Sequence, residues 1–153
     1  MKKFSTEWWL SLSPQQVGSE TEKLVEAVLK EWNRQQKFAW HRLPDTKSAR
    51  MNMIAAQPAD YVYRCNTRAG FIEAKGLAHA YRLPKENVGQ LAVLHKWALA
   101  GSHDVILVHH YLYEQWRALD PCILIPGQPS WDLRNVEAFD SPAAALRSTG
   151  YFG

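Results

Sequence analysis

Residues 60–75 carry the feature that most limits the fold of this chain. Two β-rich runs, DYVYRC at 60–65 and GFIEAK at 70–75, are separated by a hairpin signal, NTRAG at 66–70, which includes the glycine that starts the second run. This pattern predicts a β-hairpin. Asp60 starts the first run and Glu73 lies near the end of the second. Since the strands of a hairpin are antiparallel, we expect these two carboxylates to lie side by side.

The remaining apolar patterns predict helices and further strands around this hairpin. A Ser13-Pro14 start and apolar residues at helical spacing predict a helix over 13–36. A second helix is predicted over 86–100, ending at Gly101. The other expected elements are a strand at 38–43, a buried strand at 104–112, a helical turn at 114–119 and a short strand at 122–126. This order predicts an α/β fold with a mixed central β-sheet flanked by helices.

Length and composition favour one domain. The 153 residues are 46% hydrophobic, enough to fill one core. We predict a single domain over 1–153 with its core at about 18–125, and a covering tail over 126–153, which is rich in Gly, Pro and Ser. Cys65 and Cys122 are too few for a disulfide framework and are expected to be reduced thiols.

The sequence contains no stretch that predicts membrane insertion or export. It has no run of eighteen apolar residues, and its N-terminus lacks the apolar segment of a signal peptide. We therefore expect a cytoplasmic protein without a membrane partner.

The hairpin acids predict a metal site. The Asp60 and Glu73 carboxylates and the Ala74 backbone carbonyl would form an all-oxygen site, which hard cations such as Mg²⁺ prefer. Glu73 and Lys75 are two residues apart and face the same side of a strand. A lysine there could activate water or stabilise a pentavalent phosphate. The alternative is an exposed Glu73–Lys75 ion pair without catalytic function.

This arrangement resembles the PD-(D/E)xK nuclease superfamily. The signature corresponds to Pro58-Ala59-Asp60 followed by Glu73-Ala74-Lys75, with one residue inserted between the proline and the aspartate. The pattern Gly18-Ser19-Glu20-Thr21-Glu22 and the segment around Gln90 are similar to RecU-type Holliday junction resolvases of bacteria and phages. The stem that RecU proteins carry between early strands is not identifiable at 44–57.

The resemblance implies a restriction-endonuclease-like core and a metal-dependent DNA endonuclease that hydrolyses phosphodiester bonds. Mg²⁺ would be the cofactor, with Mn²⁺ as a substitute. The implied enzyme is a homodimeric Holliday junction resolvase that cuts four-way or other branched DNA by paired nicks, in the cytoplasm of a bacterium or of a phage-infected host. Two alternatives stay open: a sequence-specific restriction-type endonuclease, and a catalytically inactive DNA-binding module on the same fold.

The resemblance also implies roles for individual residues. Asp60, Glu73 and Ala74 would bind the metal with help from Glu22. The catalytic residues would be Lys75, Glu73 and Asp60, with Gln90 orienting water or a carboxylate.

Glu22 is preferred over Glu20 as the helix acid because it lies nearer the apolar face of the predicted helix. The alternative is that both are solvated acids favoured by the helix dipole.

The basic residues predict contacts with DNA. The net charge is only +3, which is compatible with nucleic-acid binding without demanding it. The expected phosphate contacts are Lys47, Arg50, Arg64, Arg68, Arg82 and Lys85. For the segment around Lys47 and Arg50 the alternative is a plain solvated loop.

Six histidines do not form a recognisable zinc motif. Of the adjacent pair His109 and His110, strand alternation predicts that one is buried and the other solvated.

Overall fold

A computed structural model describes residues 1–35, 37–44 and 57–153. The strands are β1 Phe38–Arg42, β2 Tyr61–Cys65, β3 Arg68–Leu77, β4 Arg82–Pro84, β5 Val105–His110, β6 Gln115–Leu119 and β7 Ser130–Asp132. The helices are α1 Thr6–Ser11, α2 Pro14–Trp32, α3 Leu91–Leu99 and α4 Pro142–Ser148, with short 3-10 turns η1 Lys85–Asn87 and η2 Pro121–Ile123. None of the described helices is long and apolar enough to cross a membrane.

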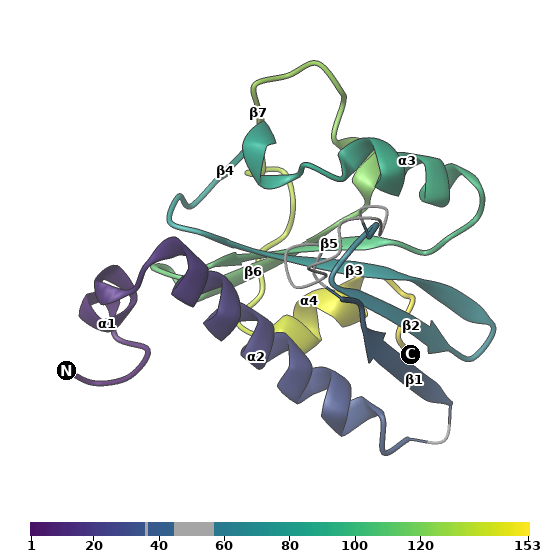
Figure 1. Cartoon of the computed structure of the whole chain (residues 1–153), viewed down its shortest axis with the longest axis horizontal. Helices are drawn as coiled ribbons and strands as arrows, with labels where there is room; N and C mark the ends of the chain where they lie inside the picture. Colours follow the sequence, from purple (N-terminus) through teal and green to yellow (C-terminus); the bar gives the residue numbers. More distant parts are fainter. Residues whose placement is uncertain (36, 45–56) are drawn as a thin grey trace.

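The main sheet has the strand order β1-β2-β3-β5-β6. Strands β3 and β5 are parallel, and the other neighbouring pairs are antiparallel. Helices α2 and α4 cover one face of this sheet, while α3 and the small β4–β7 pair lie on the other (Figure 1). The predicted α/β fold with a mixed sheet flanked by helices is therefore confirmed.

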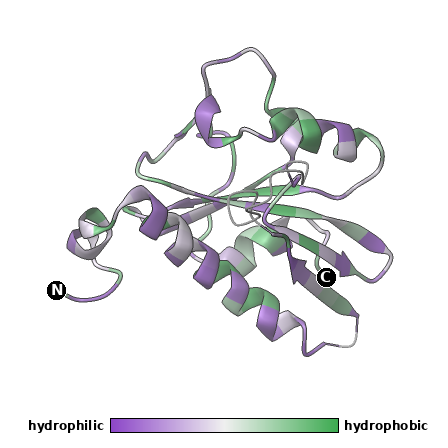
Figure 2. Cartoon of the chain, in the orientation of Figure 1, coloured by the Kyte–Doolittle hydropathy of each residue, from purple (hydrophilic) through white to green (hydrophobic). Residues whose placement is uncertain are grey.

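Helix α2 forms where its sequence predicts. The Ser13 hydroxyl accepts the Gln16 N–H, and the Gln16 side chain accepts the Ser13 N–H, which completes a capping box. Val25, Leu29 and Trp32 are buried against the sheet. Along α2, hydrophilic and hydrophobic residues alternate as expected for an amphipathic helix (Figure 2). The helix ends at Trp32, earlier than the predicted end at Gln36.

The described residues form two core clusters, one on each face of the sheet. The first includes Ile72, Ala74, Val105 and Leu107 beneath α2 and α4. The second includes Leu77, Leu83, Leu94, Ile106, Val108 and Leu133 on the α3 side. Because β5 contributes to both clusters, all six of its residues are buried, as the apolar run predicted.

Several local predictions are wrong. Residues 115–119 of the predicted helical turn at 114–119 form strand β6 instead, because they pair with β5. Residues 122–126 are not a strand: the Asp120 carboxylate caps the Cys122 N–H and starts η2 instead. The second helix is shorter than 86–100, since residues 85–87 form η1 and α3 begins at Leu91.

The core also extends beyond the predicted range of 18–125. Leu146 of α4 and Phe152 are buried within the first core cluster, and Leu133 is buried in the second. The C-terminal segment therefore supplies core side chains in addition to covering the sheet.

The expectation for His109 and His110 is likewise wrong, because both imidazoles are buried. The His109 ring stacks on Trp116, and its Nδ1 lies 3.0 Å from the Thr21 hydroxyl. Burial lowers the pKa of His109 to about 3. His110 donates its Nδ1–H to the His79 carbonyl. Both faces of the sheet are covered at this position, so alternation does not expose either ring.

Candidate active site

The site forms where β3 extends beyond the start of β2. In the antiparallel register Tyr61, the first residue of β2, is opposite Ile72, while β3 continues to Leu77. At this step the Ala74 N–H donates to Asp60 Oδ2 at 2.8 Å. The carbonyl of Asp60 accepts the Leu43 N–H at 2.8 Å. Both the side chain and the backbone of Asp60 are therefore held by hydrogen bonds at the point where β2 no longer pairs with β3.

Glu73 is the buried acid of the site, with 1% of its surface exposed. Its Oε1 lies 3.3 Å from Lys75 Nζ, and within the described part of the chain its Oε2 has no hydrogen-bond partner. Burial raises the pKa of Glu73 well above its usual range, and the neighbouring Asp60 carboxylate raises it further. The charge of Lys75 and its hydrogen bond lower the pKa of Glu73, but by less than burial and Asp60 raise it.

Strand alternation separates the side chains as the sequence predicted. The Ala74 side chain belongs to the core cluster beneath α2 and α4. Glu73 and Lys75 are close enough to form an ion pair. Both contribute to a cavity of about 150 Å³ at the sheet edge.

This cavity brings together residues from distant parts of the sequence. It is lined by five of the predicted site residues: Glu22, Asp60, Glu73, Lys75 and Gln90. Glu22 comes from α2, and Gln90 is the residue that immediately precedes α3. The other lining residues are Arg42, Leu43, Pro44, Gln57 and Ala59.

The structure separates the two helix acids. Glu22 lines the cavity. Glu20 instead pairs with two lysines, its Oε1 lying 3.0 Å from Lys23 Nζ and its Oε2 4.0 Å from Lys3 Nζ. Burial raises the pKa of Glu22, and its hydrogen bond with Arg42 opposes this shift.

Arg42 is a site residue that the sequence prediction missed. Its Nη2 lies 2.8 Å from Glu22 Oε2 and its Nη1 lies 3.4 Å from Glu26 Oε2. Its guanidinium also lies 5.9 Å from the centre of the Tyr61 ring. The available signal was a basic residue in a predicted strand, but its proximity to Asp60 depends on the pairing of Arg42 with Tyr61. That register was not part of the prediction.

The donor set fits a hard cation. The Asp60 and Glu73 carboxylates are adjacent, and Glu73 Oε2 is buried without a partner among the described residues. Mg²⁺ is commonly held by one or two carboxylates and keeps several waters. Across residues 1–35, 37–44 and 57–153, no three His, Cys, Asp or Glu side chains form a group that could hold a metal ion. Glu22, which is paired with Arg42, would therefore have to move to become a direct ligand.

Of the predicted DNA contacts, the four that lie in the described residues do not line this cavity. Arg64 and Arg68 lie at the hairpin end of β2 and β3. Arg64 is four residues from Asp60, roughly 13 Å along an extended strand. Arg82 lies on β4 and Lys85 in η1. Lys47 and Arg50 lie outside the described residues.

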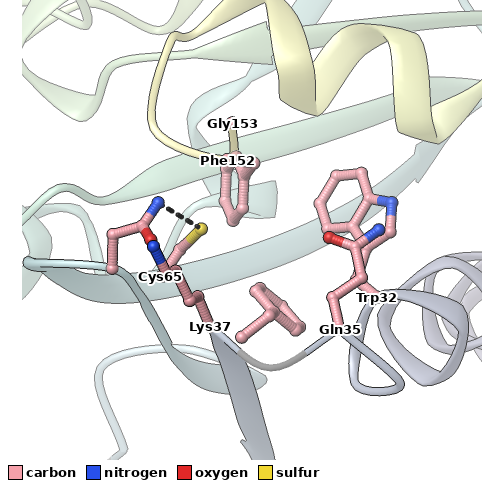
Figure 3. Close-up of a pocket in the computed structure, with 8 residues that line it drawn as sticks. Trp32, Gln35, Lys37, Cys65, Phe152 and Gly153 are labelled. Atoms are coloured by element: carbon pink, nitrogen blue, oxygen red, sulfur yellow. Dashed lines mark hydrogen bonds between the residues drawn. The ribbon is translucent and has the colours of Figure 1, made fainter.

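A larger cavity of about 390 Å³ lies at the hairpin end of β2 (Figure 3). It is lined by Trp32, Gln35, Lys37, Phe38, Cys65, Asn66, Phe152 and Gly153. Asn66 Nδ2 lies 3.9 Å from Cys65 Sγ across one wall. None of the residues that line it has a carboxylate side chain. Chemistry rather than size therefore selects the smaller cavity at Asp60 and Glu73 as the candidate active site.

Comparisons with known proteins find similarity among solved structures. No family model matches the sequence, and no curated protein matches it. Among solved structures, the chain is similar to Hjc, a Holliday junction resolvase from the archaeal hyperthermophile Archaeoglobus fulgidus. The identity is 16% and the TM-score 0.47, over 75% of this chain and 86% of that chain.

The buried carboxyl predicts a pH-dependent stability in metal-free buffer. Because the folded-state pKa of Glu73 is raised, its contribution to stability is present at low pH and decreases as pH rises above its usual value of 4.5. We expect Glu73→Gln to increase the free energy of unfolding at pH 8 by about 1–3 kcal/mol. Chemical denaturation in EDTA between pH 5 and about 8.5 measures this.

The control is Glu31→Gln, which alters an exposed surface ion pair. It should leave the pH profile unchanged. A Glu73→Gln profile parallel to that of the unmodified protein would contradict the assignment of a raised pKa to Glu73.

Proposed function

We propose that this protein is a metal-dependent DNA endonuclease that hydrolyses phosphodiester bonds in branched DNA. The observation that carries the proposal is the convergence of Asp60, Glu73 and Lys75 in one cavity, together with Glu22 and Gln90. The proposed substrate is a four-way junction, which the chain would cut as a resolvase in the cytoplasm of a bacterium or of a phage-infected host.

Asp60, Glu73 and the Ala74 carbonyl are the proposed metal ligands, with Glu22 assisting. When bound, Mg²⁺ or its substitute Mn²⁺ lowers the pKa of the attacking water and neutralises charge on the phosphate. The Ala74 N–H holds Asp60 in position through its 2.8 Å hydrogen bond. The unpartnered Glu73 Oε2 supplies an oxygen that a bound cation can use.

Lys75 and Gln90 act on the reacting groups in this proposal. The Lys75 ammonium, 3.3 Å from Glu73 Oε1, is placed to stabilise negative charge on the phosphate or to exchange a proton with the attacking water. The Gln90 amide can orient water or a carboxylate without adding charge. Arg42 holds the Glu22 carboxylate at the cavity through its 2.8 Å contact.

Cleavage assays test the proposal. We expect labelled four-way junctions to be cut with Mg²⁺ and not with EDTA, while linear duplex of the same sequence is spared. Lys75→Ala should reduce the rate by at least about 100-fold, the lower range for loss of a proton-transferring group. Lys30→Ala, at an exposed position of α2, is the control and should retain activity.

The outcomes of this assay separate the alternatives. Equal or preferred cutting of linear duplex would favour a restriction-type endonuclease. Binding of DNA without cleavage under any metal would favour an inactive DNA-binding module. A Lys75→Ala variant that cuts at the unmodified rate would overturn the catalytic assignment.

The two helix acids provide a matched pair of variants. Glu22→Gln removes a charge at the cavity, so it should lower the cleavage rate about tenfold or more, as expected for loss of a group that supports a metal site. Glu20→Gln removes the same charge from a surface ion pair and should change the rate by less than about twofold. Equal rates for the two variants would contradict the role given to Glu22.

Paired incisions require two active sites. The described chain has one Asp60, Glu73 and Lys75 set, so a two-fold symmetric junction requires two copies of the protein. Light scattering at micromolar concentration should give the mass of a dimer. A monomeric mass would overturn the resolvase proposal, whereas the nuclease chemistry of a single chain would still be testable with the cleavage assay.

A further inference from the structure

A third cavity, of about 340 Å³, lies beside β4 and β7 and is lined mainly by basic and polar side chains. Its lining residues are His79, Ala80, Tyr81, Arg82, Asp132 and Arg134. Among these side chains two are guanidinium groups, one is an imidazole and only one is a carboxylate. The cavity therefore has the electrostatic character of a site for anions rather than for cations.

Arg117 adds positive charge behind this cavity. It is 4% exposed, and it donates its Nε–H to the Val136 carbonyl at 3.0 Å and its Nη1–H to the Ala80 carbonyl at 2.9 Å. Its guanidinium lies 5.5 Å from the centre of the Tyr81 ring. None of the ion pairs found among the described residues includes Arg117. Its hydrogen bonds are satisfied by neutral carbonyls, so its charge is not cancelled by a paired acid.

The single acid of the cavity is bonded to Arg134, and Arg82 acts on it through its charge. Arg134 Nε donates to Asp132 Oδ2 at 2.9 Å, while Arg82 donates its Nη1–H to the Ser130 hydroxyl at 2.6 Å. The hydrogen bonds from Arg134 lower the pKa of Asp132 to about 2, with a smaller contribution from the charge of Arg82. One carboxylate thus faces two guanidinium groups.

The sheet register relates this cavity to the candidate active site. Lys75 pairs with Val108, and Val108 pairs with Arg117, so the three side chains lie in one row on the same face of the sheet. Two strand spacings separate Lys75 from Arg117, roughly 10 Å between Cα atoms.

We propose that the cavity formed by His79, Tyr81, Arg82 and Arg134 binds a backbone phosphate of the DNA substrate. This phosphate lies close to the phosphodiester bond that is cut in the active-site cavity of Glu73 and Lys75. This inference rests on the proposed function and adds a phosphate subsite to it. The fork of a guanidinium matches two oxygens of a phosphate. In the free protein Asp132 occupies the fork of Arg134, and the phosphate takes its place when DNA binds.

The two partners of one ion pair give opposite predictions. Asp132→Asn removes the competing carboxylate and should strengthen junction binding several-fold. Arg134→Gln removes the phosphate ligand, so it should weaken binding and reduce the slope of log K against log salt by about 0.9. Fluorescence anisotropy with a labelled four-way junction in EDTA, over a range of salt concentrations, measures both. If the ion pair served only the fold, the two variants would change binding in the same direction or leave it unchanged.

Glu31 and Arg34 form a matched control pair on the surface at the C-terminal end of α2, with Arg34 Nη1 2.9 Å from Glu31 Oε2. Glu31→Gln and Arg34→Gln change the net charge by the same amounts as the test variants. Effects as large as those at Asp132 and Arg134 would mean that total charge alone is responsible, and would overturn the subsite.

Small ligands distinguish DNA from other sources of phosphate. The two test variants and the two control variants are each titrated with inorganic phosphate and with a mononucleotide to measure their affinity for these small ligands. If Asp132→Asn and Arg134→Gln alter these titrations but not DNA binding, assignment of the cavity to a DNA phosphate is wrong. Because binding is measured in EDTA, absence of cleavage leaves this test intact. An active nuclease whose Arg134→Gln variant binds the junction normally would overturn the subsite alone.

Discussion

The buried carboxyl of Glu73 is the constraint on which the candidate site depends. An ionised carboxylate that is removed from water costs several kcal/mol unless a cation and hydrogen bonds compensate it. Glu73 has one ammonium at 3.3 Å and one oxygen without a partner among the described residues, and a second carboxylate lies beside it. The folded protein must therefore keep this acid protonated or supply additional positive charge. Buried ionisable groups that lower the stability of the folded protein in this way are typical of functional sites.

The backbone makes this arrangement possible because β3 is longer than its neighbour. β2 has five residues and β3 has ten, so the second half of β3 continues beside β5 after its pairing with β2 has ended. The Asp60 carboxylate takes over one backbone N–H that an adjacent strand would otherwise bond. The same opening of the sheet edge allows α2 and the start of α3 to contribute Glu22 and Gln90. The site is a consequence of unequal strand lengths as much as of the acidic residues themselves.

Much of the fold and of the site could be predicted from local sequence patterns. Contacts that depend on tertiary pairing could not be predicted in this way. The capped start of α2, the 60–75 hairpin and the apolar run of β5 each carry their signal within a few residues. Strand β6 has a short mixed pattern, and it becomes a strand because it pairs along β5. Leu146 and Phe152 are buried only because α4 returns to the sheet. Arg42 escaped prediction because eighteen positions separate it from Asp60, and only the β1–β2 register brings them together.

The arrangement of charge on the sheet explains why a small net charge is a poor guide to this molecule. With 18 basic and 15 acidic residues the chain is close to neutral. The acids Glu22, Asp60 and Glu73 nevertheless gather in one cavity, while Arg82, Arg134 and Arg117 lie around another. Carboxylates that attract a metal ion also repel a phosphodiester. Such a cavity needs separate positive charge nearby to hold a phosphate backbone, and the row Lys75, Val108 and Arg117 links the acidic cavity to that charge across two strands.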